Sequence, residues 1–197
     1  AYYIGDTSQK IIYLTFDEGY EAGYSAKILD VLKDNDVKAT FFVTGHYLET
    51  QADLVKRMAE EGHIVGNHSY KHLDHTQVSD EKMIEDITSC DKLITDTVGY
   101  EMPKFFRPPS GVYSIRTLEI AQELGYKTIF WSFAYKDWDT NAQPTTEEAF
   151  NMVKDNYHNG CIMLLHAVSE ANTNALDDML KFLKNEGYEF KLLTELP

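Results

Sequence analysis

The pattern of hydrophobic and polar positions alternates between short apolar runs and longer amphipathic segments along almost the whole chain. This alternation is typical of βα units, in which a buried strand is followed by a helix with one apolar face. The apolar runs predict strands at Ile11–Phe16, Lys38–Val43, His63–Gly66, Lys104–Phe106, Lys127–Ser132, Cys161–Leu165 and Glu189–Leu192. The amphipathic segments predict helices at Ser25–Asp34, Gln51–Glu61, Asp80–Val98, Ser114–Leu124, Thr146–Tyr157 and Ala171–Asn185.

Glycines mark the points where predicted helices must end before a strand, at Gly62, Gly125, Gly160 and Gly187. Strands that each connect to a helix favour an α/β fold, and at this length they favour a distorted parallel (β/α) barrel of seven or eight strands. We expect the barrel to be closed or partly closed and to form a single domain, with a doubly wound open sheet as the alternative. Residues 1–8 show no period, so we expect an N-terminal extension there and the domain over residues 9–197.

Composition and charge exclude some classes of binding partner. Of the 197 residues, 43% are hydrophobic, which is ordinary for one globular core, and the formal net charge is -14. Because this charge repels phosphate backbones and no basic run relieves it, we exclude nucleic acid as a partner. No run reaches the roughly 20 apolar residues that a transmembrane segment needs. The two cysteines, Cys90 and Cys161, are too few for a disulfide framework, so we expect buried, reduced thiols.

Polar clusters follow the predicted strands at the points where the strands end. The clusters are Asp17-Glu18, His68 with His72, Arg107 with Pro108-Pro109-Ser110-Gly111, Asp137-Trp138, and His166. Because the carboxyl ends of parallel strands meet at one edge of the sheet, we expect these side chains to converge on one face.

The two histidines indicate a metal site. If His68 and His72 lie on one helical turn, both imidazoles can reach one ion, and a carboxylate from elsewhere completes three protein ligands. Of the adjacent acids Asp17 and Glu18, one can bind the metal while its neighbour works as a base. The spacing therefore predicts a divalent metal such as Zn²⁺, with one position left for water.

At these residues the sequence resembles the polysaccharide deacetylase family, also called carbohydrate esterase family 4 or the NodB homology domain. Its five motif regions occur in order, as Thr15-Phe16-Asp17-Glu18-Gly19, His68-Ser69-Tyr70-Lys71-His72, Arg107-Pro108-Pro109-Ser110-Gly111, Trp131 to Trp138, and Leu164-Leu165-His166. The resemblance covers roughly Gln9 to Leu196, and its specificity lies in the whole set of motifs. It implies a hydrolase that acts on carbon-nitrogen bonds other than peptide bonds.

The resemblance implies that Glu18, His68 and His72 bind the metal. The family usually has a second aspartate where this chain has Glu18, and the extra methylene can change the geometry or the affinity of the site. A site held by the two histidines with more water is the alternative. Ser110 stands where the family often has an aromatic residue, which opens the groove and can accommodate a bulkier sugar substituent.

The same resemblance implies two proton-transfer residues. Asp17 would accept the proton of the attacking water, while Arg107 holds it ionised and oriented. His166 would be kept protonated by Asp137 and would donate to the leaving nitrogen. The residues implied in substrate binding are Pro109, Ser110, Gly111, Tyr113 and Trp138.

Three longer runs resemble one branch of the family, which deacetylates N-acetylmuramic acid on the way to muramic δ-lactam in spore cortex. These runs are Tyr13 to Glu21, Ala39 to Leu48, and Gly62 to Ser69. We therefore expect peptidoglycan glycan strands, preferably stripped of stem peptides, as the substrate. The alternatives are an N-acetylglucosamine deacetylase of peptidoglycan or chitin oligomers, and a non-catalytic glycan-binding domain. The resemblance also implies export to the cell wall or forespore cortex; we expect a monomer, with any N-terminal anchor lying outside this sequence.

Overall fold

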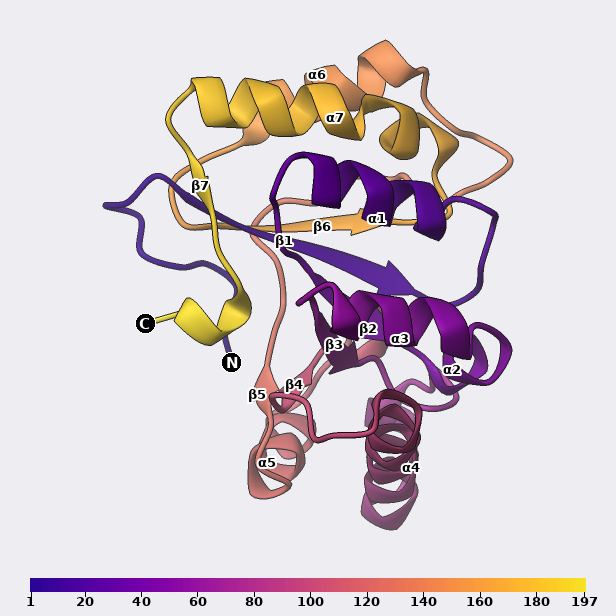
Figure 1. Cartoon of the computed structure of the whole chain (residues 1–197). Helices are drawn as coiled ribbons and strands as arrows, with labels where there is room; N and C mark the ends of the chain where they lie inside the picture. The colour runs from indigo at the N-terminus through magenta and orange to yellow at the C-terminus, as the bar shows by residue number, and fades with distance from the viewer.

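Parallel strands form one curved sheet at the centre of the computed structural model, which describes residues 1–197 (Figure 1). The strand order is β5-β4-β3-β2-β1-β6, and β7 pairs with the start of β1. The strands are β1 (Ile11–Glu18), β2 (Thr40–Val43), β3 (Ile64–Asn67), β4 (Phe105–Phe106), β5 (Lys127–Thr128), β6 (Cys161–His166) and β7 (Glu189–Phe190). All seven predicted strands are present, several of them shorter than predicted, and the α/β fold is confirmed.

Helices connect the strands, and α6, α7, α1 and α3 lie one below another along one side of the sheet in Figure 1. The helices are α1 (Ser25–Asp34), α2 (Gly45–Thr50), α3 (Ala52–Glu60), α4 (Asp80–Val98), α5 (Ile115–Glu123), α6 (Thr146–Asn156) and α7 (Glu170–Asn185). The six predicted helices are all present. Only α2 was not predicted, because its 6 residues are too few to show a hydrophobic period.

Strand β1, which pairs with β2, β6 and β7, is buried along its whole length. Successive side chains of a strand point to opposite faces of the sheet. Ile12, Leu14 and Phe16 therefore share the face that packs in one cluster with α1 and α7. Ile11 and Tyr13 belong to a second cluster on the other face. Because neither face meets water, β1 reads as a continuous apolar run in the sequence.

The sheet curls so that its two outer strands, β5 and β6, are linked by less regular pairing. The predicted strand Lys127–Ser132 keeps ladder pairing only over β5, because the chain then crosses to β6, where Phe133 forms an isolated parallel bridge with Met163. The amide of Leu164 donates to the Phe133 carbonyl over 2.9 Å. The expected distorted barrel is therefore present in its partly closed form.

Residues 2–5 pack against the same two outer strands. The Tyr2 amide donates to the Thr128 carbonyl over 2.8 Å, and the Gly5 amide donates to the Gly160 carbonyl over 2.7 Å. Gly160 has a φ of 69°, and a Cβ there would lie 2.8 Å from the carbonyl carbon and oxygen of Gly5. Both the backbone conformation and the close approach therefore require glycine. The start of the chain, expected as an extension, is packed into the wall of the domain.

Neither a membrane-spanning helix nor a disulfide shapes this fold. No helix combines the length and the apolar composition that crossing a bilayer demands. Cys90 and Cys161 are free thiols, and both are buried, as predicted. Burial raises the pKa of the Cys161 thiol to about 12, so this thiol stays protonated at neutral pH.

Candidate active site

A cavity of about 530 Å³ opens at the carboxyl ends of β1, β3 and β6. Parallel α/β folds place functional side chains at this edge of the sheet. The predicted polar clusters contribute Asp17, His68, His72, Ser110, Trp138 and His166 to the lining. The remaining lining residues are Gly19, Tyr20, Trp131, Ala134, Tyr135, Leu164 and Val168. The structure therefore brings together side chains that are far apart in the sequence.

A buried ion pair orients Asp17 in this cavity. Arg107 is fully buried and donates from Nη1 to Asp17 Oδ1 and to the Thr15 hydroxyl, each over 2.8 Å. Its other nitrogens donate to the carbonyls of Ile129 and Phe130. Burial by itself would raise the pKa of Asp17, but the charge of Arg107, together with the nearby histidines, holds that pKa below its usual value. Asp17 is therefore ionised at neutral pH and can take up a proton.

The ring of His68 presents one nitrogen to the cavity. Its Nδ1 lies 2.8 Å from the Arg107 carbonyl oxygen, which can only accept, so Nδ1 carries the proton. Nε2 then keeps a free lone pair, 3.5 Å from Asp17 Oδ2. Burial lowers the pKa of His68 to about 4, against the opposing charge of Asp17, so the ring is neutral at pH 7. A neutral imidazole whose other nitrogen is fixed by a carbonyl is a common arrangement for a metal ligand.

His72 lies in a loop, which corrects the helical turn that its spacing from His68 predicts. Ser69 and His72 have positive φ values of 67° and 54°, so the stretch is not helical. The His72 amide donates to the Ser69 hydroxyl, and the Lys71 amide donates to Asp86 Oδ1, each over 2.9 Å. These side-chain acceptors replace helical hydrogen bonds. The loop still brings the two imidazole rings to 5.0 Å between centroids.

Asp86 of α4, which the sequence analysis missed, supports this loop. Its side chain is buried, and Oδ2 lies 2.9 Å from Nε2 of the buried His75. Its carbonyl accepts a hydrogen bond from the Tyr70 amide over 3.2 Å. A carboxylate on the buried face of an amphipathic helix, between Met83 and Ile87, is the sequence signal that could have revealed it.

Glu18, predicted as the third metal ligand, does not line the cavity with the two histidines. Strand β1 extends through Glu18, two residues beyond the predicted strand, so alternation turns Asp17 into the cavity and Glu18 to the helix side. The Glu18 side chain is fully buried, and neither carboxylate oxygen has a hydrogen-bond partner. Burial first, and then the charges of Glu21 and Asp17, raise its pKa well above the usual value.

The imidazoles of His68 and His72 both line the cavity, and imidazole nitrogen is a donor that suits a divalent metal such as Zn²⁺. No group of three or more histidine, cysteine, aspartate and glutamate side chains in the chain is arranged to hold an ion. Of the three residues expected to bind the metal, His68 and His72 are the two that line the cavity. Asp17 Oδ2 is the nearest carboxylate oxygen to His68 Nε2, at 3.5 Å.

His166 ends β6 directly beside Asp17, its partner in the strand register. His166 Nδ1 lies 2.7 Å from Asp137 Oδ1, and the His166 amide donates to Asp137 Oδ2 over 2.8 Å. Burial lowers the pKa of His166, but the hydrogen bond and the charge of Asp137 outweigh it, so the pKa is raised overall. Because a carboxylate only accepts, Nδ1 carries a proton and Nε2 is the nitrogen left for the cavity.

The residues predicted to bind substrate divide into two groups. Ser110 and Trp138 line the cavity, whereas Pro109, Gly111 and Tyr113 do not. Pro109, Ser110 and Gly111 form a short 3₁₀ turn in which Ser110 has a φ of 54°. The turn presents the Ser110 side of the loop to the cavity.

Aromatic side chains form much of the cavity wall. Trp138 is 55% exposed and Tyr20 is 47% exposed, and both line the cavity together with Trp131 and Tyr135. Exposed aromatic faces at a cavity offer a ligand apolar contact area. Tyr20 was not predicted as a site residue, although its position directly after the Asp17 motif places it at the same strand end.

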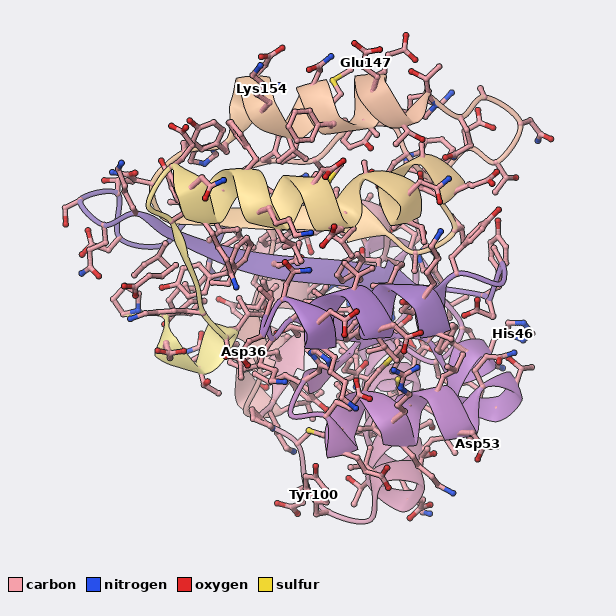
Figure 2. The ribbon with its side chains drawn as sticks, turned by 45° about the horizontal axis from the view of Figure 1, so that its top comes forward. Asp36, His46, Asp53, Tyr100, Glu147 and Lys154 are labelled. Atoms are coloured by element: carbon pink, nitrogen blue, oxygen red, sulfur yellow. The ribbon has the colours of Figure 1, made fainter.

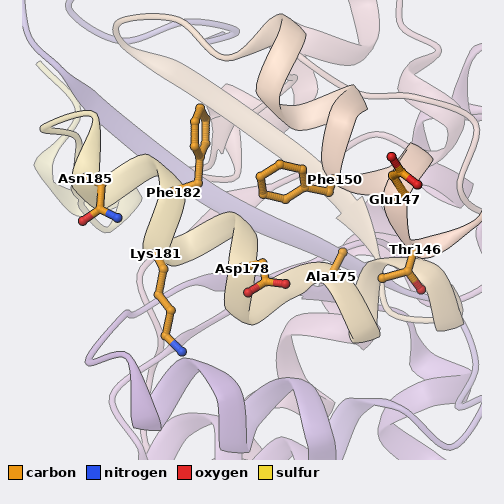
Figure 3. A pocket seen from close by; sticks show the side chains of 8 residues that line it. All are labelled: Thr146, Glu147, Phe150, Ala175, Asp178, Lys181, Phe182 and Asn185. Carbon is orange, nitrogen blue, oxygen red and sulfur yellow. The ribbon is translucent and has the colours of Figure 1, made fainter.

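A second cavity, of about 640 Å³, lies between α6 and α7 (Figure 3). The rings of Phe150 and Phe182 line it, and Figure 3 shows Lys181 pointing away from them. None of the polar clusters at the strand ends contributes a side chain to this cavity. The chemistry of the molecule therefore belongs to the cavity at the strand ends.

A carboxylate, two imidazoles and a carboxylate-paired histidine, gathered at the strand ends of a parallel barrel, define a hydrolytic enzyme of the α/β class. The family model described as polysaccharide deacetylase matches residues 4–129. The chain belongs to the polysaccharide deacetylase family, carbohydrate esterase family 4, whose deacetylases are metal-dependent hydrolases of carbon-nitrogen bonds.

Known relatives cover nearly the whole chain. The peptidoglycan-N-acetylmuramic acid deacetylase PdaA of Bacillus subtilis is 45% identical over 100% of this chain and 74% of its own length. Its solved structure has a TM-score of 0.97 and covers 100% of this chain and 84% of that chain. A peptidoglycan-N-acetylglucosamine deacetylase of Bacillus cereus is 37% identical over 96% of this chain and 89% of its own length. A family 4 pseudoenzyme from Bacillus anthracis is 30% identical, with a TM-score of 0.91 over 98% of this chain and 67% of that chain.

Proposed function

We propose that this chain is a metal-dependent deacetylase that removes the acetyl group from N-acetylmuramic acid residues of peptidoglycan. One observation carries the proposal: Asp17 and His166 are neighbours across β1 and β6, and each is held in its charged form by its own buried partner. Asp17 is thereby an ionised base and His166 an acid whose raised pKa favours the protonated form, side by side in one cavity. Two titratable groups that are tuned in this way supply the acid-base pair that amide hydrolysis needs.

The protein's own groups divide the reaction between them. Asp17 accepts the proton of the attacking water, with its carboxylate oriented by Arg107. His166 donates a proton from Nε2 to the departing nitrogen, while Asp137 fixes the ring through Nδ1. Each such proton transfer typically contributes about 10²- to 10⁴-fold in rate.

A metal on His68 and His72 completes the proposal. Both rings are available as ligands beside Asp17, and His68 is neutral with its Nε2 lone pair free. A divalent ion such as Zn²⁺ would supply Lewis acidity that polarises the acetyl carbonyl and acidifies water. With these two histidines as its protein ligands, the ion would keep positions for water.

The name of the Bacillus subtilis relative and the small side chain of Ser110 support muramic acid as the sugar. Ser110 leaves room in the cavity for a substituent such as the lactyl group. After deacetylation, the amine can attack the lactyl carboxyl of its own sugar and release water, which gives the δ-lactam. This ring closure needs a free carboxyl, so the proposed substrate is a glycan strand stripped of stem peptides, met outside the cytoplasm by a monomeric enzyme.

Two other functions have support from relatives. The Bacillus cereus relative is named for N-acetylglucosamine, which favours that sugar as the second candidate. The Bacillus anthracis pseudoenzyme shows that the fold also occurs without catalysis. Against that third reading, this chain keeps both bonded pairs, Asp17 with Arg107 and His166 with Asp137.

Mass spectrometry of digested glycan strands tests the proposal. The Zn²⁺-loaded protein is incubated with peptide-stripped strands and with intact strands, and the Asp17→Asn variant is the matched control because it keeps the side-chain shape. We expect acetyl loss from muramic acid in the stripped strands only, and none with the variant. A further loss of one water reports the lactam. Acetyl loss confined to glucosamine would refute the muramic assignment, and no loss from any strand would favour the glycan-binding function.

A further inference from the structure

The N-terminus of α7 lies against the segment that carries Asp137. Ser169, the N-cap of α7, accepts a hydrogen bond from the Asn172 amide over 3.1 Å and donates to the Gln143 side chain over 2.6 Å. Gln143 in turn donates from Nε2 to the carbonyl of Asp137 over 2.7 Å. Ser169, Asn172 and Asp137 are all buried. The backbone at Asp137 is therefore attached to the first turn of α7.

The carboxylate of Asp137 is fixed by three donors. His166 supplies two of them, Nδ1–H to Oδ1 and its amide to Oδ2, and Asn172 Nδ2 supplies the third, to Oδ2. A carboxylate turned about its own axis would lose at least one of these bonds. The amide of Asn172 therefore sets the plane in which Asp137 faces the His166 ring.

The orientation of the Asn172 amide is set in turn by Tyr135. The Tyr135 hydroxyl donates to Asn172 Oδ1, and Tyr135 also lines the cavity. Because Asp137 can only accept, Nδ2 must face the carboxylate, and Oδ1 is left for a hydroxyl donor. A chain of hydrogen bonds thus runs from the cavity wall through Tyr135, Asn172 and Asp137 to His166.

We propose that Asn172 is a positioning residue for the acid of the proposed deacetylation: it fixes the Asp137 carboxylate that orients His166, and Tyr135 fixes Asn172. This rests on the proposed function, because it assigns a partner to His166 in that reaction. Asn172 touches neither the metal-binding histidines nor Asp17 by any hydrogen bond of its own. Asn172 therefore affects only one step of the reaction, the transfer of a proton to the leaving group.

The leaving group gives a readout that a merely structural role would not move. An N-acetyl sugar releases an amine, which must be protonated as it departs. 4-Nitrophenyl acetate releases a phenolate that departs without a proton, while water attack and carbonyl polarisation remain the same. Loss of the acid therefore slows amide hydrolysis and spares the activated ester.

The test uses Asn172→Asp in the Zn²⁺-loaded protein. This change keeps the shape and the acceptor for Tyr135, but replaces the donor to Asp137 by an acceptor oxygen. We expect kcat on the N-acetylated glycan to fall by roughly 10- to 100-fold, a part of the ~10²- to 10⁴-fold that an acid contributes. KM, zinc content and the rate with 4-nitrophenyl acetate stay unchanged. His166→Ala shows the same selectivity for the amide with a larger loss.

Two further variants keep the test decisive. Asn174→Asp is the same substitution two positions along α7, at an exposed residue whose Oδ1 contacts only Lys27, and it should leave both rates unchanged. Tyr135→Phe keeps the ring and removes the hydroxyl, so it should give a weaker loss with the same selectivity for the amide. If Asn172→Asp does not fold, the Tyr135→Phe result decides.

Equal losses on amide and ester, or no loss on either, would overturn the proposal. Such a result is distinct from a failure of the proposed function, in which the wild-type protein itself releases no acetate from the glycan. If the wild-type protein hydrolyses the amide and the variants lose the amide and ester rates together, the proposed deacetylase function still holds. Asn172 would then have no specific role in positioning the acid His166.

Discussion

Asp17 and Glu18 are neighbours in the sequence, yet they face opposite sides of β1. Asp17 meets Arg107 at 2.8 Å, whereas both carboxylate oxygens of Glu18 are buried without a partner. A buried carboxylate without a partner favours its neutral form, because the charged form has lost its hydration. The two acids therefore lie in different surroundings, and only Asp17 lines the cavity.

Substitution of Glu18 by glutamine tests that placement. We expect Glu18→Gln to keep its zinc content, whereas His72→Ala should lose it, and elemental analysis of the purified proteins measures both. The pKa of Glu18 is higher in the folded protein than in the unfolded protein. The protonated carboxyl therefore contributes stability that is fully present below the unfolded pKa and is lost as the pH rises through the folded pKa. In urea titrations of the zinc-free proteins, Glu18→Gln should therefore gain stability relative to wild type from pH 4.5 to pH 7.

The matched control is Glu60→Gln, at an exposed position of α3, where the same substitution should leave this pH dependence unchanged. Loss of zinc from Glu18→Gln would mean that the Glu18 carboxylate reaches the metal. Such a result would support the predicted site with three protein ligands, Glu18, His68 and His72.

At the scale of single residues, the sequence predicts which residues lie at the site. It predicts less well which neighbouring groups orient them. Asp17, His68 and His166 could be placed because each follows a strand. Glu18 could not, because the predicted strand ended at Phe16 and left both acids free to face the cavity, whereas β1 continues and imposes alternation. Asn172 carries no local motif, and its role depends on contacts with Asp137 that only the folded chain creates.

At the scale of the elements, the boundary between β5 and β6 depends on a residue without a side chain, Gly160. Residues 2–5 pair with the segment after β5 and with the start of β6, and Gly160 lets the Gly5 backbone approach. No apolar period marks residues 1–8, because these residues pair through backbone groups at only two isolated bridges, Tyr2 with Ile129 and Ile4 with Cys161. Backbone pairing leaves little signature in a side-chain pattern.

Gly160→Ala should detach the start of the chain from this boundary. A Cβ costs about 1–2 kcal/mol at positive φ, and the clash with Gly5 adds about 1–3 kcal/mol of overpacking. Urea unfolding measures the total, and faster cleavage near residues 1–8 by a protease reports the local detachment.

Gly99→Ala separates the two costs. Gly99 also has a positive φ, 91°, but no atom lies within 4 Å of a Cβ built there. Its substitution should therefore show the conformational cost alone. Equal destabilisation by the two variants would mean that residues 2–5 move aside without cost.

Long helices were predicted well because their hydrophobic period repeats over several turns. Buried strands were predicted well because they form continuous apolar runs. The parts that failed are short or depend on other elements. The 6 residues of α2 show no period, and the turn expected at His68 and His72 gives way to a loop because Asp86 of α4 accepts the Lys71 amide. Local propensity could not anticipate a partner that comes from another helix.

Across the whole molecule, the net charge of -14 acts on the approach of substrate. Acidic side chains such as Asp36, Asp53 and Glu147 project from well-separated parts of the surface (Figure 2). Peptide-stripped strands carry a lactyl carboxylate on each muramic acid, so enzyme and proposed substrate repel one another. Such repulsion is screened over about 30 Å at 0.01 M salt and over about 8 Å at 0.15 M.

Added salt should therefore speed the reaction at low substrate concentration. We expect kcat/KM on peptide-stripped strands to rise between about 10 and 150 mM NaCl, because screening weakens long-range repulsion. Acetate release measures the rate. The control is the same glycan with its lactyl carboxyls converted to methyl esters, on which the rate should not depend on salt. A parallel rise on both substrates would assign the effect to the enzyme alone.

The position of β1 also determines the order in which the molecule can form. Strand β1 is made before its partners β6 and β7, and its Thr15 hydroxyl donates to the Met163 carbonyl, 148 positions later in the chain. Until β6 and β7 have been synthesised, one edge of a strand that begins with a run of apolar residues has no neighbour. Contacts of such separation slow folding, and an open apolar edge favours association with other chains. The nascent protein therefore depends most on protection by chaperones in the interval before β6 and β7 are made.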